Sequence, residues 1–289
     1  MQIVYHVGAF GTGMEQIIRS LLRNRDELWK VGVEIPAPSR YRGVFTEAAT
    51  ALKEGPASRE MQEMLLDAAM DSDHAARVVL CQPGFIGLPR RALTSNGLYP
   101  FAHKRLLGLS NLFPESEVEF FLGIQHPARQ VQHLLSVQKR SYESVMQGIH
   151  PLQLRWAPLF QRIVEAVPGR RIVTWAQEDL PFTWPELLRR MAGVPQAMPL
   201  LDEDTILADI LTPDALSELR TQIQGQPGLD IGGRRDLVEQ ALAQADPARM
   251  EADVEVPGWS QGLIDQLSEV YAADLAEIAA LSGVEFIAA

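Results

Sequence analysis

The residues best suited to chemistry form a glycine-rich loop near the start of the chain. Residues 8 to 13 read GAFGTG; they follow the apolar run Ile3 to Val7 and precede a stretch with apolar residues at helical spacing. In a strand–loop–helix unit, glycines let backbone N–H groups surround a phosphate, and the helix N-terminus adds partial positive charge. The loop lacks the Gly-Lys-Ser/Thr ending of a nucleotide triphosphatase loop. It therefore predicts an anion site without ATP or GTP hydrolysis.

The stretch His6 to Glu15, HVGAFGTGME, resembles the first motif of sulfotransferases, especially bacterial members whose motif reads HVGxHKTGTT. In that family the loop binds the sulfate-bearing phosphate of phosphoadenylyl sulfate (PAPS), and its lysine stabilises charge on the transferring group. That lysine's position is Gly11 here, and the two hydroxyl residues at the motif's end fall on Met14 and Glu15. Loss of one such donor commonly slows transfer about a hundredfold or more. Glu15 would also repel an anion, although it complements the helix dipole.

A second resemblance lies in Phe120 to His133, FFLGIQHPARQVQH, which is similar to the family's second nucleotide motif. There an arginine and a serine bind the ribose phosphate, and with Pro127 fixing the register their positions are Gln125 and His133. Arg129 lies one helical turn downstream, either as a substitute phosphate ligand or as a solvated helix residue. Taken together, the resemblance implies PAPS as cofactor, held by Gly8, Ala9, Phe10, Gly11, Thr12, Gly13, Met14, Glu15, Gln125, Arg129 and His133.

Other polar residues have open roles. His126 and His133 are too far apart for one zinc ion, because seven helical residues rise roughly 10 Å, so we predict no metal; each is a phosphate donor, an acid/base group, or a surface or capping residue. Glu178 and Asp179 end a predicted strand, where a carboxylate serves as a base or starts a helix. Remaining candidates are an aromatic wall or core packing for Trp175, Phe182 and Trp184, and a distant phosphate contact for Arg40, Arg42, Arg90, Arg91 or Lys104.

Strands and helices must alternate to position these residues. We expect strands at Ile3 to Val7, Lys30 to Ile35, Arg77 to Gln82, Val118 to Gln125 and Arg171 to Gln177, separated mainly by helices, with a loop at Pro36 and Pro38. This order predicts an α/β fold with a central, mainly parallel sheet and ligands at the strand carboxyl ends. The resemblance implies that it is the three-layer, P-loop NTPase-like fold of sulfotransferases. We expect one domain over residues 1–289, in which 201–289 is a mainly helical extension.

Composition excludes several classes of protein. The net charge of −11 argues against a general nucleic-acid binder. The one cysteine, Cys81, lies in an apolar run and is expected in the core. Neither a signal peptide nor a run of about 18 apolar residues is present, so we expect a cytoplasmic protein without membrane contact.

The resemblance and its substitutions are consistent with two functions. The first is transfer of sulfate from PAPS to a hydroxyl or amine acceptor. The second is a noncatalytic protein of the same fold that binds another small anion or a protein partner. Loss of the loop lysine at Gly11 favours the second. Nothing in the sequence indicates the acceptor, the catalytic residue or an oligomeric state.

Overall fold

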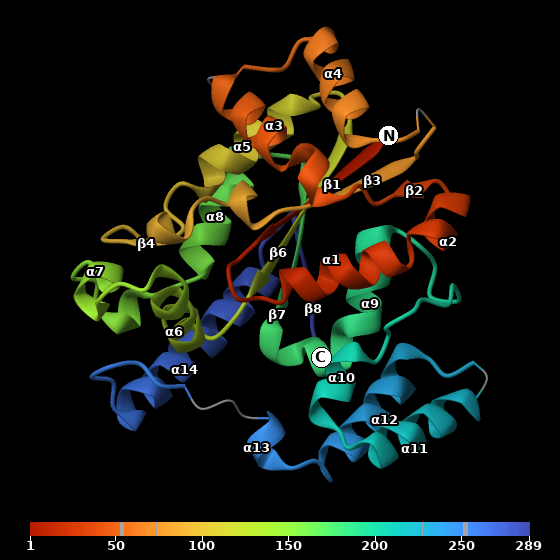
Figure 1. Ribbon diagram of the computed structural model, residues 1–289. Helices are drawn as coiled ribbons and strands as arrows, with labels where there is room; N and C mark the ends of the chain where they lie inside the picture. Colours follow the sequence, from red (N-terminus) through yellow and green to blue (C-terminus); the bar gives the residue numbers. More distant parts are fainter. Residues whose placement is uncertain (53–54, 73, 227, 251–253) are drawn as a thin grey trace.

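A six-stranded sheet forms the centre of the molecule (Figure 1), in a computed structural model that describes residues 1–52, 55–72, 74–226, 228–250 and 254–289. The strand order is β2-β3-β1-β6-β7-β8, and every neighbouring pair is parallel. The predicted α/β fold with a central parallel sheet is confirmed. The strands are β1 (Gln2–Gly8), β2 (Val33–Glu34), β3 (Arg77–Cys81), β6 (Glu117–Ile124), β7 (Arg171–Ala176) and β8 (Val284–Ile287).

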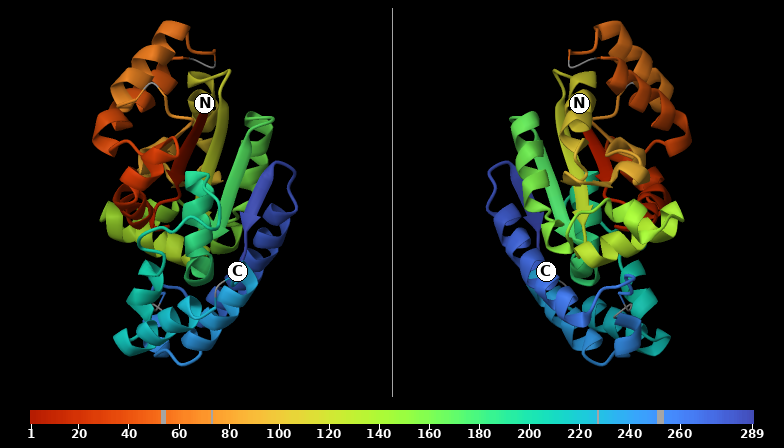
Figure 2. Two further views of the ribbon diagram at one scale, coloured as in Figure 1. Left: turned by 90° about the vertical axis from the view of Figure 1, so that its right-hand side faces the viewer. Right: turned by 90° about the vertical axis from the view of Figure 1, so that its left-hand side faces the viewer.

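Side chains alternate between two buried faces of the sheet, which explains why the strands are nearly continuous apolar runs. Ile3 and Tyr5 of β1 belong to one core cluster, and Val4 belongs to the other. Both faces are covered by helices (Figure 2). The first cluster includes residues of α3 (Pro38–Ala51), α4 (Arg59–Ala69), α5 (Ala102–Leu112), α6 (Pro127–Gln138), α7 (Tyr142–Met146), α8 (Ala157–Ala166) and α14 (Gln261–Ala279).

The second face packs against fewer helices. Ile17 and Leu21 of α1 join Val4 and Trp175 of the sheet in this cluster. A third, smaller cluster lies among later helices, which Figure 1 shows on the side toward which the parallel strands run. The remaining helices of the described chain are α1 (Met14–Arg23), α2 (Arg25–Lys30), α9 (Leu180–Ala192), α10 (Thr205–Ile210), α11 (Pro213–Gln224), α12 (Ile231–Leu242) and α13 (Pro247–Met250).

Short elements fill the connection between β3 and α5. A two-stranded antiparallel hairpin follows two 3-10 turns there, and it places Tyr99 beside the loop after β1. The four elements are η1 (Pro83–Phe85), η2 (Pro89–Arg91), β4 (Leu93–Thr94) and β5 (Gly97–Leu98). Two further 3-10 turns are η3 (Pro151–Gln153) and η4 (Gln177–Asp179).

Three expectations need correction. The strand expected over Lys30 to Ile35 shrinks to Val33–Glu34, because Lys30 still belongs to α2. Pro38 does not lie in a loop; it is the first residue of α3, where its missing N–H costs no helical hydrogen bond. The strand Val284–Ile287 after α14 was not expected, and it adds the sixth strand beside β7. Among the described residues, none of the helices is long and apolar enough to cross a bilayer.

Candidate functional site

The loop after β1 turns sharply at three glycines before α1 begins. Gly8, Gly11 and Gly13 have φ values of 124°, 83° and 71°. L-residues with a Cβ rarely adopt such values, whereas glycine does so at little cost. The glycines therefore fix the path that leads from the carboxyl end of β1 to Met14, the first residue of α1.

Five consecutive backbone N–H groups in this loop have no acceptor. The N–H groups of residues 11 to 15 donate no hydrogen bond to any part of the chain that the structure describes. The first intrahelical donors of α1 come later, since both Gln16 N (3.0 Å) and Ile17 N (3.1 Å) donate to Gly13 O. Unpaired N–H groups beside a helix N-terminus favour an anion through both hydrogen bonding and the helix dipole.

Several other polar groups of the loop are paired within the protein. Thr12 Oγ1 donates to Ala9 O at 2.8 Å, and the Thr12 side chain is 0% exposed. Phe10 N donates to the hydroxyl oxygen of Tyr99 at 3.0 Å, and Ala9 N donates to Gly123 O at 2.9 Å. Thr12 was expected to help hold PAPS; to donate its hydroxyl to a phosphate, it would have to break its bond to Ala9. The paired groups hold the loop in place, whereas the N–H groups of residues 11 to 15 have no partner in the described chain.

The three positions where sulfotransferases carry a lysine, an arginine and a serine meet in space. A Cβ at Gly11 would lie 2.8 Å from Gln125 Nε2 and 2.8 Å from His133 Cγ. Gln125 Nε2 donates to Phe10 O and to Gln130 Oε1, each at 3.2 Å. Burial lowers the pKa of His133, which favours its neutral form. A lysine side chain at position 11 has no room in this arrangement, because neutral side chains fill the space.

The remaining predicted loop and helix residues lie apart from this contact. Met14 is buried, whereas Glu15 is exposed in the first turn of α1. Arg129 is partly buried in the first turn of α6, and within the described chain its guanidinium makes neither a hydrogen bond nor an ion pair. Its positive charge acts on His126 and contributes to that residue's lowered pKa. Arg129 therefore has a free guanidinium but is not joined to the loop.

His126 and Glu178 form a polar cluster with α14. Glu178 Oε1 accepts from His126 N at 2.6 Å, and Glu178 Oε2 accepts from the hydroxyl of Tyr271 at 3.1 Å. His126 Nδ1 accepts from Ala128 N at 3.2 Å, so it caps α6 and carries no proton. In the neutral ring Nε2 then holds the proton and donates to Ser268 Oγ, 3.1 Å away.

This proton arrangement excludes nucleophilic chemistry at Ser268. A serine nucleophile needs a base that accepts its proton, but His126 Nε2 is the donor and Ser268 donates to Ile264 O. Burial, more than the charge of Arg129, lowers the pKa of His126 against the opposing charge of Glu178. The cluster ties α6, η4 and α14 together, which agrees with the capping role for His126.

The aromatic residues singled out in the sequence pack against other parts of the protein. Trp175 and Trp184 are buried in the core, and Phe182 packs against the helical cluster of α10 to α12, so they form no wall around a ligand.

Burial, followed by the charge of Glu178, raises the pKa of Asp179. Arg40 pairs with Asp71. The guanidinium and ammonium groups without an ion pair in the described chain include those of Arg42, Arg90, Arg91 and Lys104.

Two groups, one buried and one partly buried, were missed in the sequence. The ring nitrogens of His6 have no partner in the described structure, and the ring centroid lies 5.6 Å from that of Trp175. Burial lowers the pKa of His6 to about 3. Arg105, inside α5, is partly buried and likewise unpaired. A histidine within an apolar strand was the available signal for the first; Arg105 had none, because it resembles a solvated helix residue.

Comparison with known proteins gives only a distant likeness. No family model matches the chain, and no curated protein matches it. A solved structure of a sulfotransferase from Alicyclobacillus acidocaldarius is similar with a TM-score of 0.42 and 13% sequence identity, over 86% of this chain and 98% of that chain. This level of similarity assigns no activity to the chain. No group of three or more histidine, cysteine, aspartate or glutamate side chains among the described residues could hold a metal ion.

Proposed function

We propose that this protein binds a small inorganic anion such as phosphate or sulfate at residues 11 to 15 and does not transfer sulfate from PAPS. The observation that carries the proposal is the run of five unpaired backbone N–H groups at the start of α1. Backbone donors need no particular side chain, so the site tolerates Met14 and Glu15 where hydroxyl residues would otherwise contribute.

The packing around Gly11 argues against transfer. Sulfate transfer requires positive charge aimed at the charge that develops between donor and acceptor oxygens. Gln125 and His133 are neutral and occupy the space that a cationic side chain at position 11 would need. Anion binding does not require a cationic side chain at position 11, because it depends on backbone N–H groups that remain unpaired. Acceleration of sulfate transfer does require that positive charge and is therefore lost.

The test is calorimetry with inorganic phosphate and sulfate at low ionic strength on wild type, Glu15→Gln and Glu60→Gln. Glu15 and Glu60 are both exposed acids in the first turn of a helix, but only Glu15 belongs to the loop. Removing the like charge at Glu15 should tighten phosphate binding about two- to fivefold, and the gain should shrink as salt is added. Glu60→Gln should match wild type. Absence of binding, or equal effects of the two variants, overturns the proposal.

A second candidate is PAPS-dependent sulfate transfer, which the free guanidinium of Arg129 favours. Arg129 would replace the arginine absent at Gln125 by holding the ribose phosphate of the nucleotide. The measurement is transfer of labelled sulfate from PAPS to a panel of hydroxyl and amine acceptors, together with calorimetry of adenosine 3′,5′-bisphosphate. Transfer that falls in Arg129→Gln would establish this candidate and refute the noncatalytic one.

A further inference from the structure

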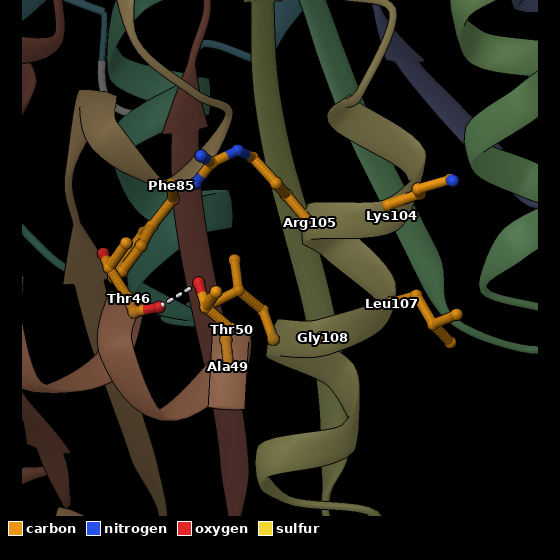
Figure 3. Close-up of a pocket in the computed structure, with 9 residues that line it drawn as sticks. Thr46, Ala49, Thr50, Phe85, Lys104, Arg105, Leu107 and Gly108 are labelled. Atoms are coloured by element: carbon orange, nitrogen blue, oxygen red, sulfur yellow. Dashed lines mark hydrogen bonds between the residues drawn. The ribbon is translucent and has the colours of Figure 1, made fainter. Parts of the chain in front are cut away.

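Two cavities adjoin the side chain of Arg105. The first, of about 240 Å³, lies between α3 and α5, and its lining includes Thr46, Thr50, Phe85 and Arg105 (Figure 3). The second, of about 180 Å³, also has Arg105 in its wall, together with Arg91 from η2. Its other lining residues are Ile86, Gly87, Leu88, Tyr99 and Phe101. A cavity of about 150 Å³ can hold benzene, so either space accepts a small ring.

Two positive charges share the smaller cavity without a carboxylate. Neither Arg91 nor Arg105 makes an ion pair or a side-chain hydrogen bond within the described chain. Burial, with a further contribution from the positive charge of Arg91, lowers the pKa of Arg105. A partly buried guanidinium beside a like charge is unfavourable unless an anion compensates it. Carboxylates are abundant in this acidic chain, yet none of the described residues that line this cavity is an aspartate or glutamate.

The direction of the side chains separates Arg105 from its neighbour. Figure 3 shows Arg105 extending from α5 toward Phe85, whereas Lys104 points away from it. Lys104 is exposed and Arg105 is partly buried. The two adjacent cations therefore have different surroundings, and the positive charge that reaches both cavities is that of Arg105.

The wall of the smaller cavity is held in an unusual backbone geometry. Tyr99 has φ 43°, which is rare for an aromatic residue. Tyr99 N donates to Ala92 O at 2.7 Å, and its hydroxyl accepts from Phe10 N at 3.0 Å. Such strain persists only where surrounding contacts fix it, and it is concentrated at ligand sites. Tyr99 thus joins the cavity wall to the loop after β1.

We propose that Arg91 and Arg105 bind the anionic head of a small organic ligand, a carboxylate or a phosphate or sulfate ester, whose apolar part packs against Ile86, Leu88 and Phe101. Guanidinium groups suit such heads, because their planar forks donate two parallel hydrogen bonds to paired oxygens. The apolar and aromatic lining supplies the contact for a ring or short chain. This site is separate from the loop at residues 11 to 15 and does not depend on it.

The probe is phenyl phosphate, titrated by calorimetry into wild type and Glu15→Gln, because binding at the loop would respond to the charge of Glu15 and binding at the cavity would not. Wild type should bind it, and Arg105→Met should weaken binding by about tenfold or more, since a hydrogen bond from a partly buried guanidinium is lost. Arg91→Met should weaken binding by a smaller factor, because Arg91 is exposed and its charge is more strongly screened. Lys104→Met is the matched control and should remain within about twofold of wild type, because Lys104 does not line the smaller cavity and its exposed charge is screened. Phenol, which lacks the anionic head, should bind much more weakly.

The outcomes separate this proposal from the proposed function. Weakening by Arg105→Met without an effect of Glu15→Gln supports the cavity site, whatever happens at the loop. Equal weakening by Arg105→Met and Lys104→Met, or no binding of phenyl phosphate to folded wild type, overturns it. Circular dichroism verifies folding of each variant. If Arg105→Met does not fold, Arg105→Lys keeps the charge without the fork and should still lose several-fold in affinity.

Discussion

The two edges of the sheet, formed by the amino ends and by the carboxyl ends of its parallel strands, differ in how their charged groups are paired. At the amino edge, Glu119 accepts from Arg77 at 2.7 Å and from Arg190 at 3.0 Å. Arg190 also donates to Glu285 at 2.7 Å, so charges from β3, β6, β8 and α9 form one network. Burial acts to raise the pKa of Glu119, but the hydrogen bonds and charges of the two arginines hold it below its usual value.

At the carboxyl edge, polar groups are left without protein partners. Within the described residues they include the N–H groups of residues 11 to 15, the ring of His6, and the guanidinium groups of Arg91 and Arg105. Buried polar groups in folded proteins are nearly always paired, and each exception needs its own explanation. The contrast within one molecule is between a buried, paired charge network at the amino edge and several unpaired polar groups at the carboxyl edge. The unpaired groups gather where ligands bind in parallel α/β sheets.

Breaking the amino-edge network should have the largest effect on stability. Glu119→Gln leaves Arg77 and Arg190 partly uncompensated, and breaking a buried ion pair typically costs about 3–5 kcal/mol. Urea unfolding at neutral pH measures the loss. Because the pKa of Glu119 is lowered on folding, its stabilisation is present above its ordinary value of 4.5 and is lost as the pH falls below it.

Glu117→Gln is the matched control, since Glu117 is an exposed acid at the start of the same strand. It should change the free energy of unfolding by less than about 1 kcal/mol. Similar losses in the two variants would mean that the network at Glu119 has no special role, and the contrast between the edges would fail.

The unpaired ring of His6 should make the protein sensitive to mild acid. Its pKa is lowered from 6.5 to about 3 in the folded state, so below pH 6.5 protons bind preferentially to the unfolded chain. Between about pH 6.5 and about pH 5 this costs about 2 kcal/mol of stability. His6→Phe, which keeps an aromatic ring beside Trp175, should remove that part of the pH dependence. Urea unfolding at both pH values checks it.

His74→Gln controls for the loss of a histidine, because His74 is exposed. It should keep the pH response of wild type, including the contributions of other histidines. If His6→Phe and wild type lose equal stability over this range, His6 is compensated in a way that contradicts its unpaired state.

Much of the fold could be predicted because strands that are buried on both faces consist of consecutive apolar residues. The runs containing Ile3, Val79 and Phe121 each became a central strand. Val284–Ile287 could not be found this way, since it is short, only partly buried and stabilised by pairing with β7. Pro38 was misread for a related reason: a proline marks a helix start as readily as a loop, and tertiary packing of α3 decides between them.

The candidate site could be predicted only where its chemistry is local. Glycines between a strand and a helix reveal an anion-binding loop, because the backbone itself supplies the donors. The contact of Gly11 with Gln125 and His133 joins residues more than a hundred positions apart, and only the motif likeness placed them together. Arg105 could not be predicted as a binding residue. Whether a carboxylate lies beside it depends on how the described chain folds, and no sequence position reveals that.

Removing an unpaired charge at the carboxyl edge should have the smallest effect on stability. Arg105→Met deletes a partly buried guanidinium that has no partner in the described structure and is repelled by Arg91. Its aliphatic contacts are retained, so the free energy of unfolding without ligand should stay within about 1 kcal/mol of wild type or rise. Arg77→Met, at the paired edge, is the matched comparison and should destabilise by several times as much, because it leaves Glu119 without one of its two close partners. Urea unfolding of the two variants measures the contrast directly. Equal losses would make Arg105 a structural residue like Arg77 and would remove the reason for expecting an anion beside it.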